Sequence, residues 1–335
     1  MSLVTAQKAR ELASAVLCNN AVSQSNANAV ARALVAAELD GLASHGLSRL
    51  LAYADQAMAG KVDGYAKPRI RLDAPAALSV DAGHGFAFPA IGFGIEHGMA
   101  RAREAGSCTV AIGHSHHAGV LGHHVEAAAE NGFVALGFSN SPAAMAPWGG
   151  SKGVFGTNPI ACAVPRSGAP PMVIDLSLSG VARGKVMLAN QRGESIPEGW
   201  ALDEAGKPTT EAAAALGGTM VPAGGAKGAA LALMVEILSA TLTGSSYAFE
   251  ASSFFNADGP PPNIGQCFWL IDPSRLAGAE FAARLEVLFA AIANQSGARL
   301  PGVRRHELRA ANEQKGVEIA DSLIAEIRRR AGLHE

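Results

Sequence analysis

Ser44, His45, Arg49 and Tyr53 lie within ten residues and combine a hydroxyl, a proton carrier and a carboxylate-binding group. In a helix, residues four apart lie on one face, so His45, Arg49 and Tyr53 would share a face. A histidine titrates near neutral pH, and a guanidinium holds a carboxylate through two parallel hydrogen bonds. The spacing therefore predicts half of a site that reduces a small 2-oxo or 2-imino acid.

The same stretch also has a purely structural interpretation. Ser44 would cap a helix, His45 would be solvated, and Arg49 would pair with Asp40 or Asp55. This segment is compatible with both interpretations, so the rest of the chain has to distinguish them.

Histidine is densest between residues 114 and 124, at His114, His116, His117, His123 and His124. Neutral imidazoles ligate metals, so a metal site is one interpretation. Against it, Glu126 and Glu130 fall in a helical pattern and no cysteine completes a ligand set. Neighbouring glycines predict a tight strand-to-helix turn of the kind that meets a cofactor. We expect His117 to contact a cofactor or substrate, or else to be a satisfied or solvated histidine. His123 and His124 are expected on the surface of a helix.

Composition restricts the class of protein. The 335 residues are enough for two lobes, and 49% of them are apolar. The net charge of -2, without a basic stripe, argues against nucleic acid and favours a small-molecule substrate. Four cysteines without paired spacing indicate thiols of a cytoplasmic protein. No stretch reaches the roughly 18 apolar residues that would span a bilayer, and the N-terminus does not look like a signal peptide.

Residue patterns alone identify no dinucleotide site. The Gly-x-Gly-x-x-Gly fingerprint that follows a strand in Rossmann enzymes does not occur in a suitable place, because Gly92-Phe93-Gly94 lies in a helical pattern. Lys227 follows glycines, but no Ser or Thr follows it as a phosphate-binding loop would require.

The pattern of apolar residues changes along the chain. The first 75 residues read as helices, whereas short apolar runs after residue 76 read as strands separated by helices, which indicates an α/β or α+β lobe with a central sheet. The segment 190–223 is rich in turn residues and is predicted to be a long ordered excursion near the site. The predicted helices are 5–17, 26–39, 45–60, 89–104, 121–131, 228–242, 279–296 and 312–330, and the predicted strands 77–81, 108–113, 134–138, 172–176 and 266–271.

Several motifs occur in an order that resembles a known family. They are Ser44-His45-Gly46, His117-Ala118-Gly119, Asn140-Ser141-Pro142, Gly156-Thr157-Asn158-Pro159, Ile174-Asp175-Leu176-Ser177 and Ala182-Arg183-Gly184-Lys185. Together they resemble the malate/L-lactate dehydrogenase family that is unrelated to Rossmann enzymes, over residues 3–330. The run from Ser139 to Gly150 is most similar to Δ1-piperideine-2-carboxylate/Δ1-pyrroline-2-carboxylate reductases.

The resemblance implies a fold and an assembly. It implies a non-Rossmann NAD(P)-binding mixed sheet flanked by helices, in a cofactor- and substrate-binding lobe over residues 76–302. A helical lobe would form from both chain ends, residues 1–75 with 303–335. Members of the family form homodimers, so a homodimer is expected.

The resemblance also implies cofactor contacts in separated loops. Carried over by position, these are His117, Ala118, Gly119, Val120, Leu121, Asp175, Leu176, Ser177, Lys227, Gly228, Pro301, Gly302, Arg304 and Arg305. Small residues let backbone amides approach phosphates, and cations neutralise them. Arg304 and Arg305 favour NADPH over NADH, unless they form a solvated turn. The family usually has Glu where this chain has Val303, which leaves the cofactor preference open.

Catalytic roles follow from the same resemblance. Arg49 would hold the substrate carboxylate, with Thr157 and the Arg183-Gly184 backbone closing the other side. His45 would deliver a proton and Ser44 would orient its ring. Lys185 stands where some imine-reducing relatives carry a carboxylate, so it would anchor the substrate or store a proton.

Three classes of function follow from these interpretations. The first is NAD(P)H-dependent reduction of cyclic 2-imino acids to L-proline or L-pipecolate by hydride transfer to C2. The second is a malate- or lactate-type 2-hydroxy-acid dehydrogenase, which would use nearly the same residues. The third is a non-enzymatic protein that binds a metal or ligand at its histidine cluster.

Overall fold

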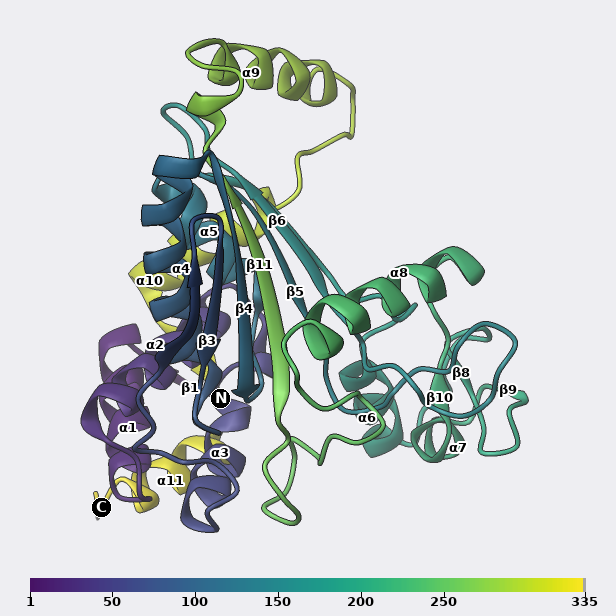
Figure 1. Ribbon diagram of the computed structural model, residues 1–335. Helices are drawn as coiled ribbons and strands as arrows, with labels where there is room; N and C mark the ends of the chain where they lie inside the picture. The colour runs from purple at the N-terminus through teal and green to yellow at the C-terminus, as the bar shows by residue number, and fades with distance from the viewer. Residues whose placement is uncertain (334–335) are drawn as a thin grey trace.

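A seven-stranded mixed sheet forms the centre of the computed structural model, which describes residues 1–333 (Figure 1). The strand order is β2-β3-β4-β11-β5-β6-β7, and only β3 and β4 are parallel neighbours. Rossmann sheets are mostly parallel, so the expected non-Rossmann mixed sheet is confirmed. The strands are β2 (Arg69–Ala74), β3 (Ala77–Asp81), β4 (Ser107–Ser115), β5 (Val134–Ser139), β6 (Ile160–Val164), β7 (Met172–Leu176) and β11 (Ile264–Ile271).

Helices α4 (Ala87–Ala105) and α5 (Leu121–Glu130) pack on one face of this sheet (Figure 1). The close approach of α4 depends on Gly98, where a Cβ would lie 2.5 Å from Val110 Cγ2 on β4. Apolar side chains from both layers, such as Ile91, Val125 and Phe268, form one buried core. This core fixes the ends of the strands from which the site residues extend.

A helical lobe forms from both chain ends, as expected. It contains α1 (Ala6–Cys18), α2 (Gln24–Leu39), α3 (Leu50–Met58) and α11 (Asp321–Arg330), and β1 (Ser2–Val4) pairs with β12 (Val317–Ile319). Thr5 and Ser23 cap α1 and α2 by accepting hydrogen bonds from the amides of Lys8 and Asn26. Helix α10 (Val303–Lys315) lies along α2 and connects this lobe to the sheet.

The turn-rich segment forms a small subdomain on the other side of the sheet (Figure 1). It contains α6 (Arg183–Arg192), α7 (Ala212–Gly217) and a three-stranded sheet of β8 (Ala201–Leu202), β9 (Pro208–Thr209) and β10 (Thr219–Met220). Helix α8 (Ala226–Glu236) follows and continues as a π-helical turn (Ile237–Thr241). Helix α9 (Glu280–Ala293) stands at one end of the molecule (Figure 1).

Three sequence predictions about elements are wrong. The expected helix 45–60 is two 3₁₀ turns, Ala43–His45 and Leu47–Arg49, before α3, because the chain leaves helical geometry at Gly46, where ψ is -142°. The expected helix 312–330 is interrupted at Gly316 (φ 95°), after which β12 pairs with β1. Residues 69–74, expected to belong to the helical lobe, form β2 at the edge of the central sheet by pairing with β3.

No helix within residues 1–333 is long and apolar enough to cross a membrane.

Candidate active site

The turn between α2 and α3 presents the first group of candidate residues. Ser44 Oγ lies 3.0 Å from His45 Nδ1, which leaves Nε2 as the ring nitrogen available to another group. Arg49 Nε donates to the Ser44 carbonyl oxygen at 2.7 Å, so its terminal nitrogens are not used in that bond. The residues do not share a helical face as expected. Instead, the two 3₁₀ turns bring them together.

His117 joins this group from the segment between β4 and α5. Its ring centroid lies 5.7 Å from that of His45. Its Nδ1 lies 2.6 Å from the hydroxyl of Tyr53, a fully buried residue of α3. The chain therefore assembles His45, Arg49, Tyr53 and His117 from two lobes.

Burial determines the protonation of the two histidines. Burial, with a further contribution from the positive charge of Arg49, lowers the pKa of His45 to about 4. Burial also lowers the pKa of His117 well below its usual value. At neutral pH His45 is therefore a neutral imidazole, which can accept a proton from a substrate hydroxyl and must first gain one before it donates.

Arg49 has no carboxylate within ion-pair distance among residues 1–333. Asp40 and Asp55, its expected partners in the structural interpretation, bind Arg309 and Arg330 instead. The Arg49 guanidinium carbon lies 4.4 Å from the ring centroid of Phe255, so one face of the group is covered. Burial lowers the pKa of Arg49, and Tyr53 offsets this effect only in part. Without a carboxylate partner among residues 1–333, Arg49 is suited to bind an anionic ligand.

The loop that carries Phe255 is fixed to α3 by two buried side chains. Gln56 Nε2 donates to the Phe254 carbonyl at 2.8 Å. Lys61 Nζ donates to the carbonyls of Ser253 at 2.7 Å and Asp258 at 2.6 Å. Phe254 itself packs against His117, with ring centroids 4.8 Å apart. Sequence reasoning missed this loop, since two adjacent aromatics in a polar segment give no periodic signal.

The residues expected to close the other side are placed unequally. Gly184 lies against Ser44, since a Cβ on Gly184 would be 3.8 Å from Ser44 Cβ. Arg183 Nη2 donates to the Leu216 carbonyl at 2.9 Å, so its guanidinium contacts the subdomain, while Lys185 is exposed. Thr157 is oriented by its amide, which donates to Ser141 Oγ at 3.1 Å.

Four segments expected to bind the cofactor gather around the end of β7. The Gly122 amide at the start of α5 donates to Asp175 Oδ2 at 2.8 Å. A Cβ on Gly302, before α10, would lie 3.1 Å from the Val173 carbonyl of β7. The segment before α8 joins them, because the Ala223 amide donates to the Leu178 carbonyl at 2.8 Å. The first turns of α5 and α10 therefore lie along β7, and the segment before α8 lies just beyond the last residue of this strand.

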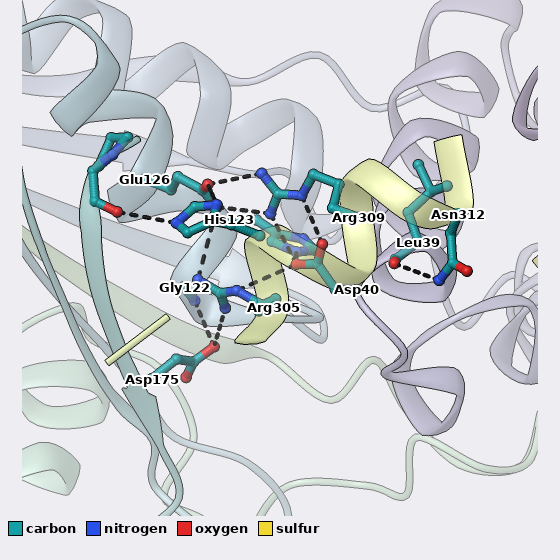
Figure 2. Close-up of polar contacts among 11 residues, drawn as sticks. Leu39, Asp40, Gly122, His123, Glu126, Asp175, Arg305, Arg309 and Asn312 are labelled. Carbon is teal, nitrogen blue, oxygen red and sulfur yellow. Dashed lines mark hydrogen bonds and ion pairs between the residues drawn. The ribbon is translucent and has the colours of Figure 1, made fainter. Parts of the chain in front are cut away.

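Arg305 and Arg309 of α10 lie in a buried network of charges (Figure 2). Arg309 Nε donates to Asp40 Oδ1 at 2.6 Å and Nη1 to Glu126 Oε1 at 2.7 Å. Arg305 lies 3.3 Å from Asp40 and 4.0 Å from Asp175, but its Nε and Nη2 make no hydrogen bond. Arg305 thus lies among carboxylates, and two of its nitrogens form no hydrogen bond within residues 1–333. Arg304 and Lys227, in contrast, are exposed.

The histidine cluster separates into five different environments. His114 lies 3.0 Å from Asp81, His116 2.8 Å from Gln56 Oε1 and His123 2.7 Å from Asp40, and His124 contacts the Ala118 carbonyl at 2.8 Å. The expectation that His123 and His124 lie on a helix surface is wrong, because both face the interior. Within residues 1–333 no three His, Cys, Asp or Glu side chains are arranged to hold a metal ion.

Comparison with known proteins identifies relatives along the whole chain. The family model described as malate/L-lactate dehydrogenase matches residues 4–328. The chain is 52% identical to a (2R)-3-sulfolactate dehydrogenase (NADP⁺) of Chromohalobacter salexigens, over 97% of each protein. It is 43% identical to a Δ1-pyrroline-2-carboxylate/Δ1-piperideine-2-carboxylate reductase of Pseudomonas aeruginosa, over 98% of each.

A solved structure agrees with these sequence matches. The Δ1-piperideine-2-carboxylate reductase of Pseudomonas syringae superposes with a TM-score of 0.93 at 37% identity, over 98% of this chain and 100% of that one. The family match covers residues 4–328, which include both the mostly antiparallel sheet and the helical lobe from the two chain ends. The chain therefore belongs to the malate/L-lactate dehydrogenase family of NAD(P)-dependent oxidoreductases.

Proposed function

We propose that this chain transfers a hydride between NADPH and C2 of a small 2-imino or 2-oxo acid. The observation that carries the proposal is Arg49, a half-buried guanidinium beside His45 with no carboxylate partner among residues 1–333. A guanidinium in this state binds a substrate carboxylate through two parallel hydrogen bonds. That contact would place C2 of a 2-oxo or 2-imino acid near the His45 ring.

His45 would move the proton that accompanies the hydride. Its Nδ1 is held by Ser44 at 3.0 Å, so Nε2 is the nitrogen that exchanges a proton with the substrate oxygen or nitrogen. A pKa of about 4 makes the neutral ring a base for the oxidation of a 2-hydroxy acid. In the direction of reduction, a bound anion next to His45 would raise its pKa and favour the proton-carrying form. The exposed Lys185, adjacent to Gly184, would supply or store that proton.

The gathered segments fit a dinucleotide. Gly119 and Gly302 adopt positive φ values (66° and 87°) just before α5 and α10, and the first turn of a helix attracts phosphate. The exposed Lys227 and Arg304 add positive charge. When bound, NADPH supplies the hydride. These cations favour NADPH over NADH, since the 2′-phosphate needs an added partner.

For the substrate, we propose cyclic 2-imino acids, Δ1-pyrroline-2-carboxylate and Δ1-piperideine-2-carboxylate. Phe255 covers one face of Arg49, which provides an apolar wall beside the carboxylate clamp that a flat ring can stack against. Trp148 does not form this wall, because it lies against Gly225, where a Cβ would be 3.0 Å from its Cζ3. Relatives named as reductases of these compounds support the proposal.

A second candidate is oxidation of (2R)-3-sulfolactate or a similar 2-hydroxy acid. The relative named for this substrate has the higher identity, 52%. A substrate with two anionic groups needs a second cation, and Lys185 stands beside the Gly184-Ser44 contact with its side chain exposed. The neutral His45 is also the form that accepts a hydroxyl proton.

A comparison of catalytic efficiencies tests both candidates. The purified protein is assayed with NADPH and the two cyclic imines, pyruvate, oxaloacetate or 3-sulfopyruvate, and with NADP⁺ and (2R)-3-sulfolactate. The imine proposal expects an efficiency at least about tenfold above the open-chain acids, roughly 1.4 kcal/mol of transition-state stabilisation. Preference for the sulfonates, lost in Lys185→Met, would establish the second candidate. Oxidation or reduction of none of these compounds would reject both.

We also propose that the chain forms a homodimer. Large apolar side chains are exposed on α8 and the adjoining π-helical turn, namely Leu231, Leu233, Met234, Ile237 and Leu242. Several large apolar side chains exposed on one helix are typical of a subunit interface. Light scattering that gives the mass of one chain at micromolar concentration would refute this proposal.

A further inference from the structure

Helix α2 ends in two acidic residues with different surroundings, Glu38 and Asp40. Asp40 is bound by Arg309 and His123, and although burial raises its pKa, these contacts lower it to about 2. Glu38 is only 9% exposed and has no cation within ion-pair distance among residues 1–333. Burial raises its pKa, which the hydrogen bond from Leu47 offsets in part. A buried carboxylate without a cation is unfavourable unless its hydrogen bonds are needed.

The Glu38 carboxylate is bound to the turn that carries the candidate catalytic residues. Its Oε1 accepts a hydrogen bond of 2.6 Å from the Leu47 amide, which lies at the start of the second 3₁₀ turn. That amide has no helical partner, because the chain leaves helical geometry at Gly46. The Glu38 side chain, which comes from α2, thus caps the second 3₁₀ turn by accepting the hydrogen bond of its first amide.

Gly46 has a second contact with the same side chain. A Cβ at this position would lie 2.3 Å from Glu38 Oε1 and 2.5 Å from Cδ. Its φ of -95° lies outside the left-handed region that favours glycine. The space that Glu38 occupies is a constraint on Gly46. Two independent contacts, a hydrogen bond and a close approach, fix this turn against α2.

We infer that Glu38 is a positioning residue, which holds the turn so that His45 and Arg49 face the substrate. The inference rests on the roles proposed above for these two residues. Arg49 follows Leu47 by two positions and also donates to the Ser44 carbonyl. Displacing the Leu47 amide therefore moves the clamp and the proton carrier together. A charge-assisted hydrogen bond is stronger than a neutral one, so a carboxylate holds the turn better than an amide would.

The first test compares Glu38→Ala with Glu38→Gln. Alanine removes the acceptor, and turnover at saturating substrate is expected to fall at least about tenfold while the dissociation constant of NADPH stays within about twofold. Glutamine keeps an acceptor oxygen, so most of the turnover returns. Glu96→Ala, an exposed position on α4, is the matched control and keeps wild-type turnover. Wild-type turnover in Glu38→Ala would overturn the inference.

A double-mutant cycle tests the contact with Gly46. Gly46→Ala alone pushes the turn away from Glu38 and is expected to lower turnover at least about tenfold. In Glu38→Ala/Gly46→Ala the space is free, so the pair is no worse than Glu38→Ala alone. Gly92→Ala, where a Cβ meets nothing within 4 Å, is the control for the substitution itself. Independent effects that multiply in the double variant would contradict a shared role.

A measurement without substrate separates this inference from the proposed function. Amide hydrogen exchange of Leu47 in the full-length protein is expected to accelerate at least about tenfold in Glu38→Ala and less in Glu38→Gln. Unchanged exchange would overturn the role of Glu38 even if the enzyme reduces imines. Accelerated exchange in a protein that turns over none of the acids would instead refute the proposed function and leave Glu38 as the residue that holds the turn.

Discussion

Arg49 and Arg309 are both half-buried, but their surroundings are opposite. Arg309 lies between the carboxylates of Asp40 and Glu126, whose hydrogen bonds raise its pKa (Figure 2). Arg49 has a backbone carbonyl and the ring of Phe255 as its neighbours, and burial lowers its pKa. A guanidinium with satisfied charge holds elements together, whereas one without an anion is prepared to bind a ligand.

The largest expected effect is a loss of folding stability at acidic pH, caused by buried histidines. Like Arg49, these histidines have no carboxylate as a partner within residues 1–333. Burial lowers the pKa of His124, packed between Phe88 and Phe268, to about 4. The unfolded chain therefore binds more protons than the folded one between about pH 4 and pH 6.5, so stability is full above pH 6.5 and falls below it.

Urea unfolding between pH 7 and pH 4 measures this loss. Each such histidine contributes a slope of up to roughly 1.4 kcal/mol per pH unit. His124→Gln, which keeps a donor for the Ala118 carbonyl, is expected to flatten the curve by about one such slope. A curve of the same steepness in this variant would show that His124 is not neutral in the folded protein.

Arg309→Met removes the cation between two buried carboxylates. We expect the free energy of unfolding to fall by about 3–5 kcal/mol, because Asp40 and Glu126 remain buried without their partner. Arg49→Met breaks no ion pair and is expected to cost less than about 1 kcal/mol. Guanidinium unfolding at pH 7 measures both. Equal losses would remove the distinction between the two arginines.

His45→Ala tests the proton carrier beside Arg49. Turnover at saturating substrate is expected to fall by about 10²-fold or more, the usual contribution of a positioned acid or base. NADPH binding, followed by fluorescence, is expected to stay near wild type, since His45 and its partner Ser44 lie outside the segments expected to bind the cofactor. An unchanged turnover number would exclude His45 from the mechanism.

Residue types and motifs indicated which residues lie together better than they indicated the backbone that carries them. The types of Ser44, His45 and Arg49 suggested carboxylate binding and proton transfer, and family motifs suggested the segments that gather around β7. The prediction that His45 and Arg49 share one face of a helix was wrong. The turn at Gly46 packs against Glu38, and the periodicity of the local sequence does not reveal such a contact. In the same way, the partners of Arg305 and His123 come from distant segments that only the tertiary fold brings together.

Arg49→Lys sharpens the comparison by keeping the charge and changing its shape. A lysine ammonium cannot form two parallel hydrogen bonds with a carboxylate, so the loss is expected mainly in the Michaelis constant, about 1–3 kcal/mol. Initial-rate kinetics at saturating NADPH measures it. Both kinetic constants would stay near wild type if Arg49 did not bind the substrate carboxylate.

The smallest effect concerns Arg304, which is exposed beside the carboxylate-bound Arg305. As a free cation at the start of α10, Arg304 would contact the 2′-phosphate of NADPH at a site open to water, where one ion pair contributes about 0.2–1 kcal/mol. Arg304→Ala is therefore expected to raise the Michaelis constant for NADPH up to about fivefold and to leave that for NADH unchanged. An equal change for both cofactors would place Arg304 away from the 2′-phosphate.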